Sequence, residues 1–130
     1  MEIDYIALFV SDVARSLIFY RDVLGFSFEK PAKPDGAEGY SGKLKIGIYD
    51  RSWLPKLFGD RGDRPISGHP FLLSMTVDDL DLVYQQICAN IQANISVDII
   101  APPKVMPWGQ RILFLSDPDG NILEIVQSTH

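Results

Sequence analysis

The stretch IDYIALFVSDVARSLIFYRDVLGFSFEK, residues 3–30, joins an apolar segment, a segment with helical periodicity and a second short apolar segment. Asp12 stands where a helix N-cap is expected, and Gly25 stands where a helix is expected to stop. Between them apolar residues recur at helical spacing: Val13, Leu17, Tyr20 and Leu24. The stretch therefore predicts a strand, a helix and a strand, in that order.

The same order returns in the second half of the chain, in FLLSMTVDDLDLVYQQICANIQANISVDII, residues 71–100. Val77-Asp78-Asp79 repeats Val10-Ser11-Asp12 at an offset of 77 − 10 = 67 residues. A second helical stripe follows this repeat: Leu80, Val83, Tyr84 and Ile87. The repetition predicts two equivalent modules.

Each module ends in two further strand-like runs. In the first half these are GYSGK and LKIGIYD, and in the second half QRILFLSD and NILEIVQ, joined by a Pro-Asp-Gly turn. The predicted fold class is α+β, with two tandem β-α-β-β-β modules at about 1–50 and about 70–130 in one domain, 1–130. A linker at about 51–69, rich in Gly, Pro and charge, carries a short apolar cluster that favours a brief helix.

Composition limits the classes of partner. The chain is 46% hydrophobic and 22% charged, which fits a compact globular domain. Its net charge of −5 disfavours nucleic acid and anionic membranes, because binding to polyphosphate needs a basic surface. The opening MEIDYIALFV has no basic signal region, and no apolar run approaches the ~20 residues that span a bilayer. We expect a cytoplasmic location and a small molecule or a protein as partner.

Three stretches resemble one family. VSDVARSLIFYRDVLGF, VDDLDLVYQQI and PWGQRILFLSDPDGNILEIVQ look like the vicinal oxygen chelate superfamily, which includes glyoxalase I, extradiol dioxygenases, fosfomycin-resistance proteins and bleomycin-resistance proteins. The resemblance covers nearly the whole chain, and the last stretch is its most specific part. It implies that the modules curl their sheets into a cup, with the helices outside, the ligand inside and, in most members, a homodimer.

Strand alternation selects the side chains that face the ligand. In the last strand Leu123 and Ile125 share the helix-facing side, so Glu124 faces the cavity. The same rule places other residues on that side: Tyr5, Ala7 and Phe9; Lys45, Gly47 and Tyr49; Leu72, Ser74 and Thr76. Apolar walls with a few polar groups are typical of ligand pockets.

In metal-using members of the family, the glutamate matched by Glu124 is a ligand. The resemblance implies that its companions are a His or Gln on the first strand of each module and a carboxylate on the first module's last strand. Here Tyr5 and Leu72 stand at the first two positions, and LKIGIYD offers no carboxylate on the corresponding face. One donor is too few for a protein-held divalent metal, so we expect neither a metal nor another cofactor.

Three further residues are candidates for ligand contact. Trp108, next to Gly109, is either a stacking wall for a flat ligand or an anchor in the core or a dimer interface. Arg111 is either solvated or the donor that pairs with Glu124 or with a ligand carboxylate. Trp53 in the linker, together with Phe58, forms either a lid or a tether to the core.

Two functions are compatible with these observations. The first is a protein that binds a small aromatic or amphipathic molecule without a complete metal site. The second is a metal-dependent lyase, isomerase or dioxygenase with an atypical metal site, in which Glu124 is the candidate catalytic residue. The number of metal donors favours the first function. The expected ligand-binding residues are Tyr5, Tyr49, Leu72, Ser74, Trp108, Arg111, Glu124 and Trp53.

Overall fold

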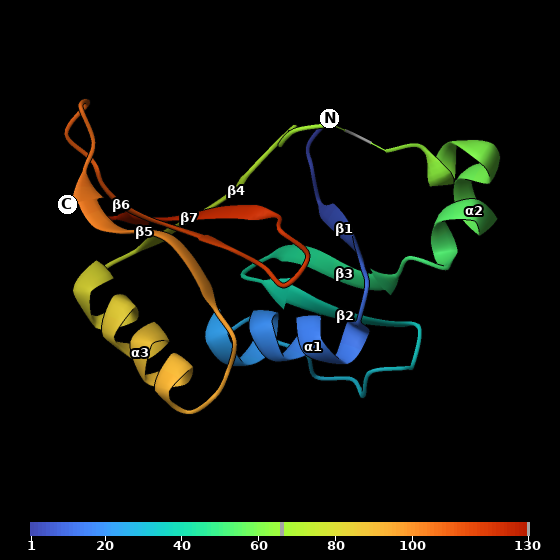
Figure 1. The fold of residues 1–130 in the computed structure, drawn as a ribbon, viewed down its shortest axis with the longest axis horizontal. Coiled ribbons are helices and arrows are strands. Elements are labelled where there is room, and N and C mark those ends of the chain that lie inside the picture. The colour runs from blue at the N-terminus through green and yellow to red at the C-terminus, as the bar shows by residue number, and fades with distance from the viewer. Residues whose placement is uncertain (66, 130) are drawn as a thin grey trace. The chain divides into compact units, whose positions relative to one another are not determined.

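A computed structural model describes residues 1–65 and 67–129, which form two compact units, Met1–Ile66 and Ser67–His130 (Figure 1). The first unit holds a three-stranded sheet of order β1-β3-β2, and the second a four-stranded sheet of order β4-β7-β6-β5. The two modules and the α+β class are confirmed, but each module has its own sheet. Within the described ranges, no helix is both long enough and apolar enough to cross a membrane.

The first unit builds one mixed sheet under one helix. Its elements in chain order are β1 (Tyr5–Val10), α1 (Val13–Leu17), continued by the π-helical turn η1 (Ile18–Val23), β2 (Gly36–Ser41), β3 (Leu44–Asp50), α2 (Trp53–Phe58) and the 3₁₀ helix η2 (Gly59–Asp63). Strand β3 runs parallel to β1 and antiparallel to β2. Alternate residues of β1 and β3 are buried on the side of α1, as predicted: Leu8, Val10, Ile46 and Ile48.

The second predicted strand of this module is reduced to one bridge. Ser27 and Tyr40 exchange two backbone hydrogen bonds, Ser27 N to Tyr40 O at 3.0 Å and Tyr40 N to Ser27 O at 2.8 Å. Gly39 permits this close approach, because a Cβ there would collide with the Ser27 carbonyl oxygen and the Phe28 ring. Pro31 lies four residues after Ser27, and because proline has no backbone N–H it cannot donate a hydrogen bond to extend the strand pairing.

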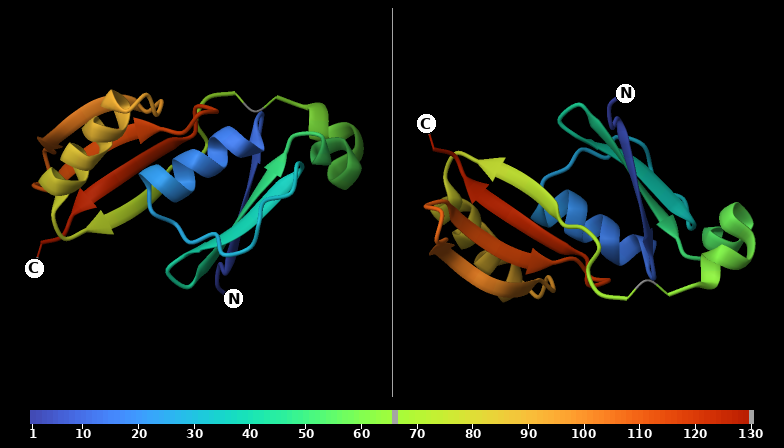
Figure 2. Two further views of the ribbon diagram at one scale, coloured as in Figure 1. Left: turned by 90° about the horizontal axis from the view of Figure 1, so that it is seen from below. Right: turned by 90° about the horizontal axis from the view of Figure 1, so that it is seen from above.

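The second unit contains the complete β-α-β-β-β order. Its elements are β4 (Leu73–Val77), α3 (Leu80–Gln92), β5 (Asp98–Val105), β6 (Arg111–Ser116) and β7 (Ile122–Gln127). Figure 2 shows α3 lying along one face of the four-stranded sheet. The side chains buried between them are Leu80, Ile87, Leu113, Leu115, Leu123 and Ile125. The predicted alternation in the last strand is therefore confirmed, since Leu123 and Ile125 face α3.

The sequence repeat corresponds to equivalent helix starts. The Asp12 carboxylate accepts a hydrogen bond from Arg15 N at 3.1 Å, and the Asp79 carboxylate accepts one from Leu82 N at 3.0 Å. Both aspartates have extended backbones and lie 79 − 12 = 67 residues apart. Such caps satisfy N–H groups that have no partner within the helix.

Strand β5 ends the second sheet on one side and carries two adjacent prolines, Pro102 and Pro103. Its pairing with β6 shifts register between Ile99 and Ala101 and again between Ala101 and Lys104. Prolines are tolerated at a sheet edge because one side of an edge strand makes no ladder bonds. The sequence had predicted only a short strand here, and the structure extends it to Val105.

Candidate functional site

Four polar side chains meet on the face of the first sheet opposite α1. The hydroxyls of Tyr5 and Tyr49 contact each other, and each lies within hydrogen-bond distance of Glu38 Oε2, at 3.1 and 2.9 Å, so that two phenol protons are shared among three oxygen atoms. Lys45 Nζ lies 3.5 Å from the same oxygen and 5.7 Å from the centroid of the Tyr5 ring. We call these four residues the tyrosine cluster; it joins all three strands of the sheet.

Strand register explains why these side chains meet. Tyr5 lies opposite Lys45 across the β1–β3 pair, and Glu38 lies opposite Gly47 across the β2–β3 pair. Gly47 leaves the centre of the face without a side chain. A Cβ at this position would collide with the Tyr5 hydroxyl and with the Tyr49 ring. The two phenols can therefore make contact above Gly47 because this residue has no side chain.

Hydrogen bonds and burial in the tyrosine cluster shift the pKa values of Glu38, Tyr5 and Tyr49. The hydrogen bond from Tyr49 is the main cause that holds the pKa of the Glu38 carboxyl below its usual value, so Glu38 is ionised near neutral pH. Burial is the main cause that raises the pKa of both the Tyr5 and the Tyr49 phenols above the usual tyrosine value. The phenols are therefore neutral donors and the carboxylate is their acceptor.

Aromatic rings extend this face beyond the tyrosine cluster. Phe9 lies 6.2 Å from Tyr49 between ring centroids, and Phe58 of α2 packs edge-on against Phe9 at 5.9 Å. Phe58 is still 51% exposed. Trp53 instead lies under the Lys56 ammonium, 4.9 Å from its ring centroid. Phe58 thus contacts the first sheet, while Trp53 is partly buried beside Lys56.

The second sheet has a corresponding face that contains Glu124. Its neighbours across the strands are Ser74 on β4 and Phe114 on β6. Beside them lies a small apolar cluster of Met106, Ile112 and Val126, against which Phe114 packs. Glu124 is partly buried and Ser74 is exposed. The glutamate therefore faces away from α3, as strand alternation predicts.

The turn before β7 positions Glu124. The buried Asp117 carboxylate accepts hydrogen bonds from Asp119 N at 2.9 Å, Asn121 N at 2.8 Å and Asn121 Nδ2 at 2.9 Å. Gly120 adopts a φ of 87°, which glycine reaches without strain. An aspartate that bonds the backbone two residues on is typical of a tight turn. This turn sets the register in which Glu124 lies beside Ser74.

The internal repeat relates the two faces residue by residue. Ser74 is equivalent to Ala7, since 74 − 7 = 67. Across the parallel strand pairs, Ser74 lies opposite Glu124 and Ala7 lies opposite Gly47. Gly47 is therefore the first module's equivalent of Glu124, and Tyr5, at the position equivalent to Leu72, directs its hydroxyl over it.

Three predicted ligand-binding residues have surroundings that the sequence left open. Arg111 forms an ion pair with Asp81 of α3, at 2.6 Å between Nη2 and Oδ1, and not with Glu124. Its strand parity places it with Leu113 and Leu115 on the helix side. Trp108 is 66% exposed, and its Nε1 donates to Gln110 Oε1 at 2.9 Å. Leu72 precedes β4 and is 44% exposed.

Donors for a metal are sparse. Across residues 1–65 and 67–129, no three His, Cys, Asp or Glu side chains form a group that could hold a metal ion. The Tyr5 hydroxyl is engaged by Tyr49 and Glu38, Gly47 has no side chain, and Leu72 is apolar. The positions that a metal centre of the resembled family would use therefore supply one carboxylate, Glu124, and do not fit a transition metal.

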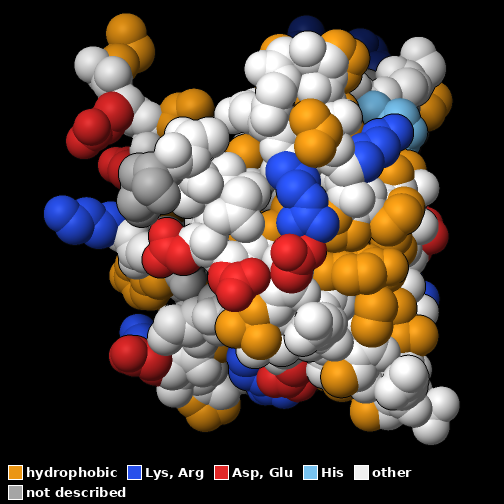
Figure 3. Space-filling model, turned by 90° about the vertical axis from the view of Figure 1, so that its left-hand side faces the viewer, with side chains coloured by type: hydrophobic (Ala, Val, Ile, Leu, Met, Phe, Trp, Pro, Cys, Tyr) orange, Lys and Arg blue, Asp and Glu red, His pale blue; other side chains and the backbone are white. Residues whose placement is uncertain are grey.

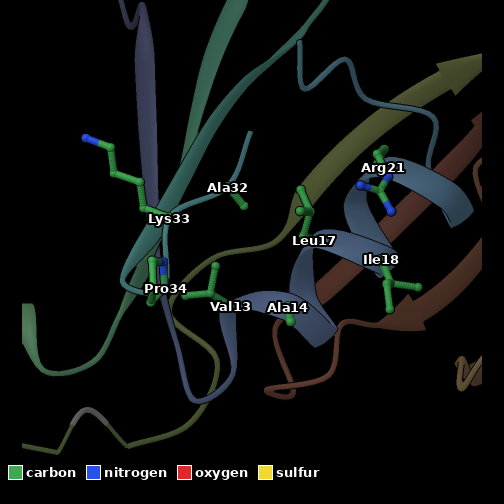
Figure 4. Close-up of a pocket in the computed structure, with 8 residues that line it drawn as sticks. All are labelled: Val13, Ala14, Leu17, Ile18, Arg21, Ala32, Lys33 and Pro34. Carbon is green, nitrogen blue, oxygen red and sulfur yellow. The ribbon is translucent and has the colours of Figure 1, made fainter. Parts of the chain in front are cut away.

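A separate groove lies on the helix side of the first sheet, between α1 and the segment that follows η1 (Figure 4). Its volume is about 460 Å³, and it is lined by Val13, Ala14, Leu17, Ile18, Arg21, Ala32, Lys33 and Pro34. The Arg21 guanidinium is paired with Asp22, at 2.8 Å from Nε to Oδ1. Sequence analysis did not predict this groove, which lies on the opposite side of the sheet from the tyrosine cluster.

Charge on the surface is mixed in sign. On the side of the molecule drawn in Figure 3, acidic and basic side chains lie interspersed, beside gathered hydrophobic side chains. This distribution accords with a chain of net charge −5 that has no clustered lysines or arginines. A nucleic-acid surface would require a single-sign basic field.

One family model matches nearly the whole chain, and several known proteins are similar to it. The sequence model described as Glyoxalase/Bleomycin resistance protein/Dioxygenase superfamily matches residues 2–125. "Uncharacterized protein YaeR" of Escherichia coli is 27% identical over 132 residues, which cover 97% of this chain and 95% of that protein. "Virulence protein STM3117" of Salmonella typhimurium is 30% identical over 126 residues, with 96% and 83% covered.

Solved structures share the fold. A protein from Burkholderia phytofirmans, described as a glyoxalase/bleomycin resistance protein/dioxygenase family enzyme, superposes with a TM-score of 0.82 at 24% identity and covers 99% of this chain and 100% of that one. This likeness supports the two-module fold described above.

Proposed function

Because the chain belongs to the Glyoxalase/Bleomycin resistance protein/Dioxygenase superfamily, we propose that it binds a small aromatic or amphipathic molecule and holds no resident transition metal. The tyrosine cluster carries this proposal. It combines an ionised carboxylate, two neutral phenols and an ammonium on a sheet face that also carries Phe9 and the exposed ring of Phe58. Apolar walls with a few directed polar groups are the usual form of a ligand site.

Burial supports ligand access to this face. The Lys45 and Glu38 side chains are 40% and 46% exposed, so both can be reached from solvent. The second sheet adds a comparable set, with Glu124 beside Ser74 and the partly buried Phe114. Each module thus presents one carboxylate next to aromatic surface, on the side that its helix does not cover.

The alternative is a metal-dependent lyase, isomerase or dioxygenase. Glu124 is the observation that favours it, because this carboxylate stands at the position of a metal ligand in the metal-using relatives. Two further donors at Tyr5 and Leu72 would be needed, and neither side chain suits a divalent transition metal. The binding function therefore has the stronger support.

A homodimer is part of the proposal. The second unit has exposed apolar side chains at Phe71, Leu72 and Ile100, which a second copy can cover. Dimers with a two-fold axis are the commonest protein assemblies.

The experiment that tests the binding function is a screen of small aromatic molecules, followed by tryptophan fluorescence and thermal shift. Hits are then titrated against Tyr49→Phe, Glu124→Gln and Trp108→Ala. At least one of the three variants should weaken binding several-fold, since stacking on an indole adds about 0.5–1.5 kcal/mol beyond burial. Tyr84→Phe on α3 is the matched control and should bind as the unaltered protein does. Hits that are indifferent to all three variants would place the binding elsewhere.

A further inference from the structure

The tyrosine cluster already holds a cation, which is supplied by the chain itself. Lys45 Nζ lies 5.7 Å from the centroid of the Tyr5 ring and 3.5 Å from Glu38 Oε2. An aromatic face and a carboxylate are the two features by which proteins bind ammonium groups. The position of Lys45 Nζ therefore has the features of a cation-binding site.

Lys45 is a replaceable occupant of this place. Its ion pair with Glu38 is a single contact between side chains that are 40% and 46% exposed, and such pairs add little to stability. The Glu38 carboxylate has partners besides Lys45, because the hydroxyls of Tyr5 and Tyr49 lie within hydrogen-bond distance of the same oxygen. If the flexible lysine turned into solvent, the carboxylate and the Tyr5 ring would stay in position.

We propose that the ligand of this face is an organic cation: an ammonium or quaternary ammonium group on an apolar or aromatic body. Its charged group takes the place of Lys45 Nζ beside Glu38 and the Tyr5 ring. Its body lies along Phe9 and Phe58, which continue the aromatic row from Tyr49. This inference rests on the proposed function, since it names the ligand class of the same face.

Charge argues against an anionic ligand here. An anion drawn to Lys45 would come to lie beside the ionised Glu38, at a distance where like charges repel. Glu38 is the one carboxylate among the residues that β1, β2 and β3 direct to this face. A cation arriving from solvent displaces only the exposed Lys45 ammonium, and the chain's net charge of −5 attracts it.

The test uses three probes of similar size: benzyltrimethylammonium, benzyl alcohol and phenylacetate. Chemical-shift titration of the full chain should show that the ammonium binds about five- to tenfold more tightly than the alcohol, as expected for a cation over an aromatic ring. Lys45→Met keeps the apolar stem and vacates the cation place, so it should increase affinity for the ammonium. Glu38→Gln keeps the shape and should reduce the preference for the ammonium to the part that the Tyr5 ring supplies. Lys33→Met and Glu29→Gln, outside this face, are the matched controls.

Each contrary result has its own meaning. Equal binding of the alcohol and the ammonium, unchanged in Glu38→Gln, would reject the cation and leave the proposed binding function standing. Preference for phenylacetate, lost in Lys45→Met, would replace the cation with an anion. No shift of Tyr5, Tyr49 or Phe9 resonances with any probe would overturn the inference, while the screen of neutral aromatics tests the function independently. Misfolding cannot explain the expected outcome, because Lys45→Met is predicted to gain affinity.

Discussion

Gly47 occupies in the first sheet the position that Glu124 occupies in the second. Each lies on the strand parallel to its module's first strand, opposite Ala7 and Ser74 respectively. Where the second module presents a carboxylate, the first presents bare backbone beneath two phenols. The two modules share a backbone plan, and their faces carry different chemistry.

This difference predicts the metal content. With Gly47, Tyr5 and Leu72 at three of the relevant positions, we expect the purified protein to contain far less than one equivalent of zinc, nickel, iron or manganese per chain. Elemental analysis of protein prepared without chelator measures this directly. Near one equivalent of metal that disappears in Glu124→Gln would contradict it and favour the metal-dependent enzyme.

Tyrosine titration reports on the cluster. The pKa values of Tyr5 and Tyr49 lie above the usual value, so their effect on stability is present below the pKa of an unfolded tyrosine, about 10, and is lost as pH rises through the folded values. Phenolate absorbance should therefore show tyrosines that ionise at a higher pH than an unfolded tyrosine does. Their number should fall by one in Tyr5→Phe and by one in Tyr49→Phe.

Tyr84 provides the control for this titration. Its hydrogen bond with Cys88 also raises its pKa, so Tyr84→Phe should remove a late step without altering those of Tyr5 and Tyr49. Five tyrosines that all titrate together near pH 10 would show that the cluster does not form in solution.

Two glycines should differ in their tolerance of a methyl group. At Gly39 the added Cβ meets the backbone carbonyl of Ser27, which can move only with the chain, so Gly39→Ala should destabilise the fold by about 1–3 kcal/mol. At Gly47 the added Cβ meets the ends of Tyr5 and Tyr49, which can turn aside. Gly47→Ala should thus cost less stability but remove the late tyrosine titration. Denaturant unfolding of both variants tests the order, and an equal loss would refute it.

Assembly is the fourth prediction. We expect a mass of two chains, or about 29 kDa from 14.6 kDa each, in light scattering at micromolar concentration. A charge placed at the exposed Leu72 by Leu72→Glu should shift the mass toward one chain, whereas Leu57→Glu, on the exposed side of α2, should not. A single-chain mass that is independent of concentration would exclude the dimer.

Much of the fold could be predicted because local signals and burial agree. The Asp12 and Asp79 caps, the helical stripes and the alternation around Glu124 each have a direct physical cause, and all were read from the sequence. The strand expected at 26–30 is only a bridge, because strand formation depends on the register with β2 and on Pro31. No local pattern encodes that pairing.

The candidate site was predicted in part. Tyr5 and Tyr49 were placed on the correct face, but Glu38 was missed because β2 was expected to begin at Gly39 and begins at Gly36. Counting back by two from Tyr40 would have found Glu38. Alternation along β6 places Arg111 on the same face as Leu113 and Leu115. Its position on the helix side could therefore also have been predicted from the sequence. The ligand-binding role of these residues stays a prediction.

The two prolines of β5 weaken one edge of the second sheet as a template for a further strand. Pro102 and Pro103 have no N–H to offer a neighbouring strand, and the two register shifts bend this edge. Strand β4, at the opposite end of the sheet, contains no proline and offers a further strand a more regular edge. Edge-to-edge association of copies through β5 is thereby disfavoured.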